Sequence, residues 1–261
     1  MARITILDCG TTTVDEALPF SDRSRNKLAF TGILRGKSHK ITVPVTAYLI
    51  ELPKALILVD TGWDTAIRTD ARKYEGFFNY FASPGFLPPG KAVTDHLEAL
   101  GYKPSDLDYC ILTHMDIDHA GGLALVRDAK RILASESEKK ASEGLHPRYL
   151  HRLWRGIGIR TFPDREFDLL GDGSVTLIPM HGHSEGMTAV KVQGDDGFAI
   201  IAGDAGYGRR SWENLVLPGV EANREEALAS LRKLQGFAKS PQCKAILMTH
   251  DPEHATGIIE L

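Results

Sequence analysis

The sequence predicts an α/β fold in which two β-sheets pack together and helices cover their outer faces. Its 261 residues, of which 43% are apolar and 25% charged, suit one large globular domain or two small ones. Strand-like segments occupy both halves of the chain. In each half, a set of strands is followed by a helix, a short strand and a residue that can bind a metal ion. The halves are alike only in this order of elements.

The first half is rich in strand-like segments, which alternate or are rich in β-branched residues. One of them, ALILVDTGW, ends in a polar turn at Asp60, Thr61 and Gly62. A helix is expected near residues 91–101, where Gly101 stops it. The strands expected in this half are ARITILD (2–8), KITVPVTAYLIEL (40–52), ALILVDTGW (55–63) and YCILT (109–113).

Residues 76–90, GFFNYFASPGFLPPG, fit neither the helical nor the strand period. The segment is aromatic and is interrupted by proline and glycine. A loop of this kind either packs on the core or covers a pocket, and the burial of structural aromatics is the commoner case. Both interpretations stay open on the sequence alone.

In the second half, a helix is expected to begin near Ala120 and a longer one to occupy residues 224–238. Asn223 can cap the longer helix, with Glu226 at its third position and leucines at core spacing. Residues 136–160 are charged and helical in part. The strands expected here are RILAS (131–135), VTLIPM (175–180), MTAVKV (187–192), GFAIIAG (197–203) and CKAILMT (243–249).

Composition argues against several classes of protein. The formal net charge of −3 argues weakly against a nucleic-acid or anionic-membrane partner, and no apolar run approaches the ~20 residues that span a bilayer. The start of the chain lacks the pattern of a secretory signal.

The cysteines Cys9, Cys110 and Cys243 are odd in number and far apart. Cys110 and Cys243 lie in strand-like runs and are expected to be small buried hydrophobes. The pattern predicts a cytoplasmic protein without disulfides.

Residues 113–122, THMDIDHAGG, hold four potential metal ligands within six positions, namely His114, Asp116, Asp118 and His119. An Asp-x-Asp-His run before a helix can also be an N-cap with a chance neighbour. Four such side chains directly after a strand favour a metal site instead. The small residues that follow leave room for ions and let backbone segments come close.

Three later residues also follow strands: His183 in HGHSEGM, Asp204 in IIAGDAGY and His250 in LMTHD. Taken alone, a histidine at a strand end is more often structural, and an aspartate there is often a turn residue. Together they would reach one edge of the fold. The interpretation is two ions with water between them, which becomes hydroxide near neutral pH. The first ion takes His114, Asp116 and His183, the second takes Asp118, His119 and His250, and Asp204 bridges both.

These motifs resemble those of the metallo-β-lactamase superfamily, and they occur in the family's order along nearly the whole chain. The resemblance implies a single domain over residues 1–261 with a four-layer αβ/βα sandwich. Two mixed β-sheets flanked by helices would carry a dinuclear metal site at their edge. The matching segments are VDTG (59–62), THMDIDHAGG (113–122), GHSEGM (182–187), AGD (202–204) and the late His250.

Within the superfamily, the chain is most similar to the N-acyl-homoserine lactonases, which are quorum-quenching hydrolases. Asp204 is followed three residues later by Tyr207, and THD at 249–251 resembles the last metal-ligand segment of that group. The resemblance implies that Tyr207 contacts the substrate carbonyl and that residues 76–90 cover the substrate. A packed ring with a satisfied hydroxyl is the structural alternative for Tyr207.

Asp116 departs from the family pattern, which has histidine at this position. A carboxylate is harder than imidazole and negatively charged, so it raises the preference for iron or manganese over zinc. It also makes the bound water less acidic. Because aspartate is short, the first ion could shift or bind loosely. His181 could compensate, although an extra histidine more often supports a ligand or lies at the surface. A carboxylate at this position also occurs in flavodiiron reductases, which carry a flavin domain, and the 261 residues are expected to leave no room for one.

The sequence thus predicts a metal-dependent hydrolase with two divalent ions. Zinc is the first candidate for these ions, and Asp116 makes iron or manganese an alternative. It would open a small lactone by attack of a metal-bridging hydroxide. Tyr207 and the second metal would stabilise the oxyanion, and Asp118 would pass a proton to the leaving alkoxide. An apolar part of the substrate would be covered by Phe77, Phe78, Tyr80, Phe81 and Phe86.

Three alternatives stay open. One is a hydrolase of thioesters, phosphodiesters or β-lactams, for which Arg209 and Arg210 are the only nearby basic hint. The second is a di-iron oxidoreductase, and the third is a metal-binding protein without catalysis. The partner is a small molecule in the preferred interpretation, and the sequence does not decide between a monomer and a homodimer.

Overall fold

The computed structural model describes residues 1–21, 26 and 28–261, and within these ranges thirteen strands form two sheets. The first sheet has eight strands in the order β13-β1-β2-β3-β5-β6-β7, with β4 paired to β1. Its strands are β1 (Arg3–Asp15), β2 (Lys40–Leu52), β3 (Ala55–Val59), β4 (Gly85–Phe86), β5 (Tyr109–Ile111), β6 (Ile132–Ser135), β7 (Ile159–Phe162) and β13 (Gly257–Glu260).

The second sheet has five strands in the order β12-β11-β10-β9-β8. Its strands are β8 (Phe167–Asp168), β9 (Val175–Pro179), β10 (Thr188–Gly194), β11 (Gly197–Ile201) and β12 (Cys243–Leu247). Both sheets are mixed, since β3, β5, β6 and β7 run parallel, as do β11 and β12, while the other pairs are antiparallel. All five residues of β11 are buried, as expected for a strand that is covered on both faces.

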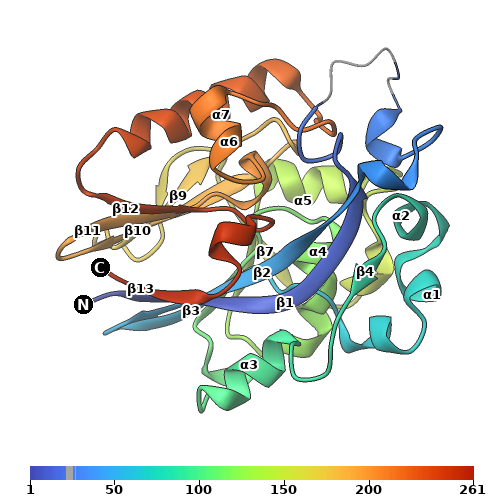
Figure 1. Cartoon of the computed structure of the whole chain (residues 1–261). Coiled ribbons are helices and arrows are strands. Elements are labelled where there is room, and N and C mark those ends of the chain that lie inside the picture. The colour runs from blue at the N-terminus through green and yellow to red at the C-terminus, as the bar shows by residue number, and fades with distance from the viewer. Residues whose placement is uncertain (22–25, 27) are drawn as a thin grey trace.

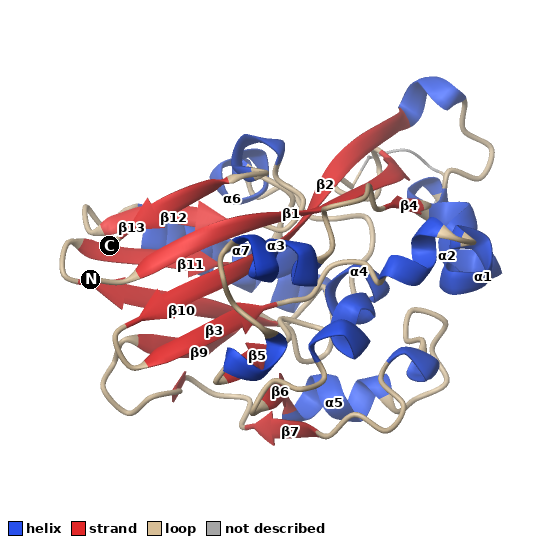
Figure 2. Ribbon diagram, turned by 90° about the horizontal axis from the view of Figure 1, so that it is seen from below, coloured by secondary structure: helices blue, strands red, loops and turns tan. Residues whose placement is uncertain are grey.

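Helices cover the outer faces of both sheets (Figure 1). The long α7 and the short α6 lie over the second sheet, and α3 lies below the first. Seen from below, α1, α2 and α4 gather beyond the end of the strands that is opposite to the two chain termini (Figure 2). The helices are α1 (Ala71–Glu75), α2 (Phe77–Ala82), α3 (Val93–Ala99), α4 (Ile117–Ala120), α5 (Glu136–Ser142), α6 (Arg209–Asn214) and α7 (Arg224–Ala238).

Three apolar cores separate the four layers. Along β2, Leu49 joins the core beneath the first sheet and its neighbour Ile50 joins the core between the sheets. This alternation with a period of two is what the sequence of a strand buried on both faces requires. On the other side, Leu231 of α7 packs with Ile200 of β11. Each fully buried side chain of this kind contributes about 1.5–3 kcal/mol. The predicted αβ/βα sandwich is confirmed.

Several predicted elements are confirmed. The strand at 40–52 and the helix at 224–238 have the predicted bounds. The Asn223 side chain accepts hydrogen bonds from the backbone N–H groups of Glu225 and Glu226, at 3.0 and 3.2 Å. Short elements without their own periodicity, such as β7, β13 and α6, were not predicted.

Other predictions were wrong in detail. The first strand continues to Asp15, and the helix expected near Ala120 begins at Ile117. Residues 76–90 are not one loop, because they contain α2 and β4. The aromatic residues of α2 are exposed on a helix of six residues, which is too short to show a helical period in the sequence. Cys9 and Cys110 are buried, but Cys243, at the start of β12, is only partly buried.

Within the described part of the chain, no helix is both long and apolar enough to cross a membrane.

Candidate metal centre

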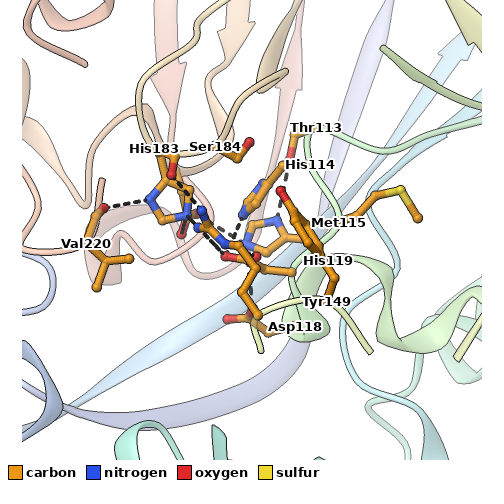
Figure 3. A network of polar contacts seen from close by, with 12 residues as sticks. Thr113, His114, Met115, Asp118, His119, Tyr149, His183, Ser184 and Val220 are labelled. Carbon is orange, nitrogen blue, oxygen red and sulfur yellow. Dashed lines mark hydrogen bonds and ion pairs between the residues drawn. The ribbon is translucent and has the colours of Figure 1, made fainter. Parts of the chain in front are cut away.

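The predicted ligands lie at one edge of the sandwich, where several strands end. Asp116 precedes α4, which carries Asp118 and His119, and His114 follows β5. His183 comes shortly after β9, while Asp204 and His250 follow β11 and β12. Figure 3 shows the imidazoles of His114, His119 and His183 turned toward one another, with Asp118 beside them. The convergence that the sequence predicted is therefore what the structure shows.

The ligand atoms form overlapping groups in which all atoms lie within 4.8 Å of one another. Two of these groups are the ones assigned from the sequence, and a third joins them through His114, His119 and Asp204. The first cluster is His114, Asp116 and His183. The second cluster is Asp118, His119 and His250, with Asp204 beside it.

The atoms of the second cluster have the spacing of ligands around one ion. His250 Nε2 lies 3.4 Å from Asp118 Oδ2 and 3.3 Å from Asp204 Oδ2. His119 Nε2 lies 3.3 Å from Asp204 Oδ1. Ligand atoms bound at about 2.1 Å to a tetrahedral ion are themselves about 3.4 Å apart. His119 Nε2 and Asp204 Oδ1 are buried and have no hydrogen-bond partner among the described residues. Such atoms are rare in folded proteins, so their presence here indicates a cation site.

The imidazoles of the second cluster are held in the tautomer that a metal ion needs. His119 Nδ1 donates to Asp60 Oδ2 at 2.8 Å, and His250 Nδ1 donates to the carbonyl of Pro44 at 2.7 Å. Each Nε2 therefore keeps its lone pair toward the centre. Two imidazoles and two carboxylates fit a divalent cation such as zinc, iron or manganese.

Asp60, in the VDTG motif, fixes the position of His119. Its carboxylate also accepts hydrogen bonds from the Thr113 backbone N–H at 2.8 Å and from the Thr113 hydroxyl at 2.7 Å. Its backbone adopts a φ of 59°, which is strained for a residue other than glycine. The sequence marked Asp60 as part of a polar turn and of the matching VDTG segment, without a role of its own. A Cβ on Gly122 would lie 2.5 Å from the Thr61 carbonyl oxygen, so this glycine allows two backbone segments to approach.

A buried carboxylate, Glu138, joins the loops that carry the first cluster. It accepts hydrogen bonds from the backbone N–H groups of Met115 and Gly186 at 2.9 and 3.1 Å. It also accepts them from the hydroxyls of Ser184 at 2.6 Å and Tyr149 at 3.2 Å. Sequence reasoning missed Glu138, because Ser135 three residues earlier makes it look like an ordinary helix-capping glutamate.

Arg148 lies inside the first cluster, and sequence reasoning also missed it. Its Nε and Nη2 donate to Asp116 Oδ1 and Oδ2 at 2.6 and 2.8 Å. Nη2 also lies 2.7 Å from His183 Nε2, and Nη1 donates to the His183 carbonyl at 2.8 Å. Only 14% of the Arg148 side chain is exposed. Arg148 is one of four arginines in the charged segment 136–160, so the sequence gave no signal of this role.

The two clusters differ in their electrostatics. Although burial opposes ionisation, Arg148 and His114 hold the pKa of Asp116 well below its usual value. Burial, together with Arg148, lowers the pKa of His183. In the second cluster, burial again opposes the charged form, but carboxylates led by Asp204 raise the pKa of both His119 and His250. The second cluster therefore has an excess of negative charge, whereas the first already contains a cation.

Tyr207 lies beside ligands of both clusters, with its ring centroid 6.4 Å from that of His183. Its ring stacks on His250, with centroids 5.1 Å apart and an interplanar angle of 9°. Burial, followed by the charge of Asp204, raises the pKa of Tyr207 well above its ordinary value. The phenol therefore stays protonated and can donate a hydrogen bond at any physiological pH.

A pocket of about 1200 Å³ opens above both clusters. Its floor includes Asp118, Tyr207 and His250, and its walls are largely apolar. Of the aromatic residues expected to cover a substrate, the structure places three in the wall and leaves Tyr80 and Phe86 outside it. The apolar wall residues include Phe77, Phe78 and Phe81 on α2, and Leu18, Phe30, Ile33 and Val43 from the first part of the chain.

The comparison with known families agrees with this geometry. A family model described as the metallo-beta-lactamase superfamily matches residues 41–240. The chain belongs to this superfamily.

Curated relatives in the superfamily cover most of the chain. The N-acyl homoserine lactonase AttM of Rhizobium radiobacter is 26% identical over 228 residues, which cover 84% of this chain and 86% of the relative. An N-acyl homoserine lactonase of a Bacillus species is 28% identical over 229 residues, covering 83% of this chain and 85% of that protein. A probable metallo-hydrolase of Mycobacterium tuberculosis is 28% identical over 225 residues, covering 78% and 70%.

Solved structures show the same fold. An N-acyl homoserine lactone hydrolase with the product N-hexanoyl-L-homoserine at its catalytic metal centre aligns with a TM-score of 0.81 and 23% identity, covering 96% of this chain and 94% of that one. AidC, a dizinc quorum-quenching lactonase, aligns with a TM-score of 0.68 and 17% identity, covering 100% and 91%. The resemblance to the superfamily and to its lactonases is thus confirmed.

The structure does not support two minor expectations from the sequence, namely a basic pocket formed by Arg209 and Arg210 and a ligand role for His181. Arg209 lies 3.3 Å from Glu213, and Arg210 packs over the ring of Phe20 at 4.8 Å. Neither arginine lines the pocket, so these residues do not support the alternative of a phosphodiesterase. His181 belongs to none of the three ligand groups found among the described residues, and its Nε2 lies 3.9 Å from Asp164.

Proposed function

We propose that the chain is a metal-dependent hydrolase that opens small lactones with an apolar acyl group, as N-acyl homoserine lactones have. The observation that carries this proposal is the second cluster, whose buried ligand atoms lie at the floor of a large apolar pocket. The relatives named as lactonases support the same substrate class.

Asp118, His119, Asp204 and His250 would hold a divalent ion, with zinc as the first candidate and iron or manganese as alternatives. When bound, the ion supplies a Lewis acid and lowers the pKa of water toward neutrality. The sequence predicted a second ion at the first cluster, and that prediction has to be weighed against Arg148.

The protein's own groups bind and orient the lactone. The protonated Tyr207 hydroxyl would donate a hydrogen bond to the carbonyl oxygen, where negative charge develops in the transition state. Asp118, which lines the pocket floor, would carry a proton to the ring oxygen as it leaves. The apolar walls would bind the acyl chain and exclude water from it.

The test uses protein that has been stripped with a chelator and reloaded with zinc, manganese or ferrous iron. A panel of lactones with different acyl chains is followed by the proton that ring opening releases. Metal-dependent turnover is expected, and Tyr207→Phe should lower kcat about 100-fold with little change in KM. Tyr80→Phe, on α2 but outside the pocket, is the matched control. The proposal fails if no lactone is opened by fully loaded protein and Tyr207→Phe changes no hydrolytic rate.

We also infer a cytoplasmic enzyme, because all three cysteines are free thiols and a reducing compartment keeps them so.

A further inference from the structure

We propose that the guanidinium of Arg148 is the permanent cation of the first cluster, so that the chain binds one divalent ion, at the second cluster. Asp116 would then be an arginine partner and not a metal ligand. This inference rests on the proposed metal-dependent function and concerns which cations the centre contains.

The contacts of Arg148 form a complete binding site for a guanidinium. Nε and Nη2 meet the two oxygens of Asp116 in a bidentate pair, and Nη1 donates to the His183 carbonyl. The planar fork of arginine matches a carboxylate in this way, and a histidine at position 116 would offer it no such partner. The unexpected aspartate and the arginine therefore form one unit.

The same contacts occupy the atoms that an ion would need. An arginine N–H can only donate, so His183 Nε2, at 2.7 Å from Nη2, accepts, and its 3.2 Å approach to Asp116 Oδ2 is then not a hydrogen bond. His183 Nδ1 is the donor to the Val220 carbonyl at 3.2 Å, a contact drawn in Figure 3. An imidazole nitrogen has a single lone pair, which cannot bind both an N–H and a metal ion. Two of the three residues of the first cluster are therefore already engaged by Arg148.

The charges agree with this assignment. Arg148 and Asp116 balance each other, and His183 is neutral because its Nε2 accepts a hydrogen bond from Arg148 and therefore carries no proton. In the second cluster, Asp118 and Asp204 bring two negative charges that one divalent ion balances. A second divalent ion placed beside Arg148 would leave uncompensated positive charge in a mostly buried site, even with a hydroxide between the ions, which is unfavourable.

Arg148 is also held by its surroundings. Its side chain is mostly buried, and its guanidinium carbon lies 5.9 Å from the centre of the Tyr149 ring. Tyr149 in turn donates to Glu138, which joins the two loops of the first cluster. Leaving this position would cost the arginine all of its charged partners.

The experiment counts metal ions in the full-length protein. Protein saturated with zinc or cobalt is freed of excess metal and analysed by elemental mass spectrometry. Wild type should hold about one ion per chain. The double variant Arg148→Ala with Asp116→His removes the guanidinium and restores a three-ligand cluster, so it should hold about two. Arg155→Ala, an exposed arginine seven residues further on, is the matched control and should hold one.

A second measurement locates the single ion. In the cobalt-loaded protein, His250→Ala should abolish the visible absorption of the bound ion, whereas His183→Ala should retain it. Retention in His250→Ala with loss in His183→Ala would place the ion in the first cluster and overturn the proposal.

Two ions in wild type would also overturn it. So would one ion in both wild type and the double variant, because something other than Arg148 would then exclude the metal. If the double variant does not fold, Arg148→Met with Asp116 intact is measured in its place, and a second ion is again expected. No ion in wild type would contradict the proposed metal-dependent function itself. One ion without lactone hydrolysis would contradict only the lactonase proposal.

Discussion

The two clusters contain the same kinds of residue, yet the structure gives them different chemistry. Each combines imidazole with carboxylate, and each lies at the ends of neighbouring strands. In the second cluster, His119 and Asp204 carry buried atoms without a hydrogen-bond partner among the described residues. In the first, His114 Nε2 is also buried without such a partner, but Asp116 and His183 are occupied by Arg148. The difference teaches that ligand types at the right spacing do not by themselves define a metal site, because a side chain from elsewhere can supply the charge.

The strongest way to break this comparison is to remove the cation of the first cluster. Arg148→Ala leaves Asp116, whose side chain is only 18% exposed, without its charged partner, which should lower the free energy of unfolding by about 3–5 kcal/mol. Urea unfolding of the metal-free protein measures it, with Arg155→Ala as the control. A loss below about 1 kcal/mol would show that the ion pair does not hold the first cluster together.

Glu75 is a buried carboxylate whose effect on the free energy of unfolding should change with pH in the opposite sense to that of Asp116. Burial raises the pKa of Glu75 to about 7, although the Gly85 N–H at 3.0 Å opposes the shift. The folded state therefore binds this proton more tightly, and the stabilisation present below pH 4.5 is lost as pH rises toward 7. The wild type should lose about 2–3 kcal/mol from this group between pH 5 and 8.

Glu75→Gln keeps the side-chain shape and cannot ionise, so it should unfold with a flatter pH dependence than wild type. Urea unfolding at pH 5 and pH 8 gives the comparison. Equal pH dependence in the two proteins would mean that Glu75 is ionised across this range. Asp116, whose pKa is lowered, contributes stability above its unfolded pKa and loses it only in acid.

Substitution of a residue that supports the second cluster should lower metal affinity more than substitution of one that supports the first cluster. Asp60 orients His119 of the second cluster, so Asp60→Ala should weaken metal affinity about 10–100-fold. Glu138 binds Met115, between the first-cluster ligands His114 and Asp116, and the loop after His183, so Glu138→Gln should destabilise the fold while changing metal affinity little. Titration with a competing chelator measures both. A larger loss of affinity in Glu138→Gln than in Asp60→Ala would reverse the roles given to the clusters.

The smallest expected effect lies in the pocket wall. Phe78, 73% exposed, lines the pocket above the clusters, whereas Phe86, 64% exposed, lies outside it. Phe78→Ala should raise KM for long-chain lactones about 5–10-fold and leave short-chain lactones nearly unchanged, because only the longer chain reaches it. Phe86→Ala is the matched control. If both substitutions changed KM equally, or if Phe78→Ala changed KM equally for long and short chains, α2 would not be part of the binding site.

The sequence predicted the layers and the ligand positions because both depend on local patterns. Alternating apolar runs predicted β2, and a polar residue after each strand predicted His183, Asp204 and His250. Asp116 was recognised as unusual, but its partner could not be found. Arg148 lies 32 residues away in a segment without periodicity, and no local rule connects the two. Glu138 was missed for the same reason, since its contacts are made only in three dimensions.

The separation of the clusters along the chain has a consequence for their order of assembly. The Asp116–Arg148 pair is complete once residue 148 has been made, whereas the second cluster waits for His250, about a hundred residues later. At about 5–20 residues per second, synthesis of that interval takes roughly 5–20 s. The first cluster has all its residues once His183 has been made, while Asp118 and His119 still lack His250. The second cluster is therefore the last part of the centre for which every residue is available.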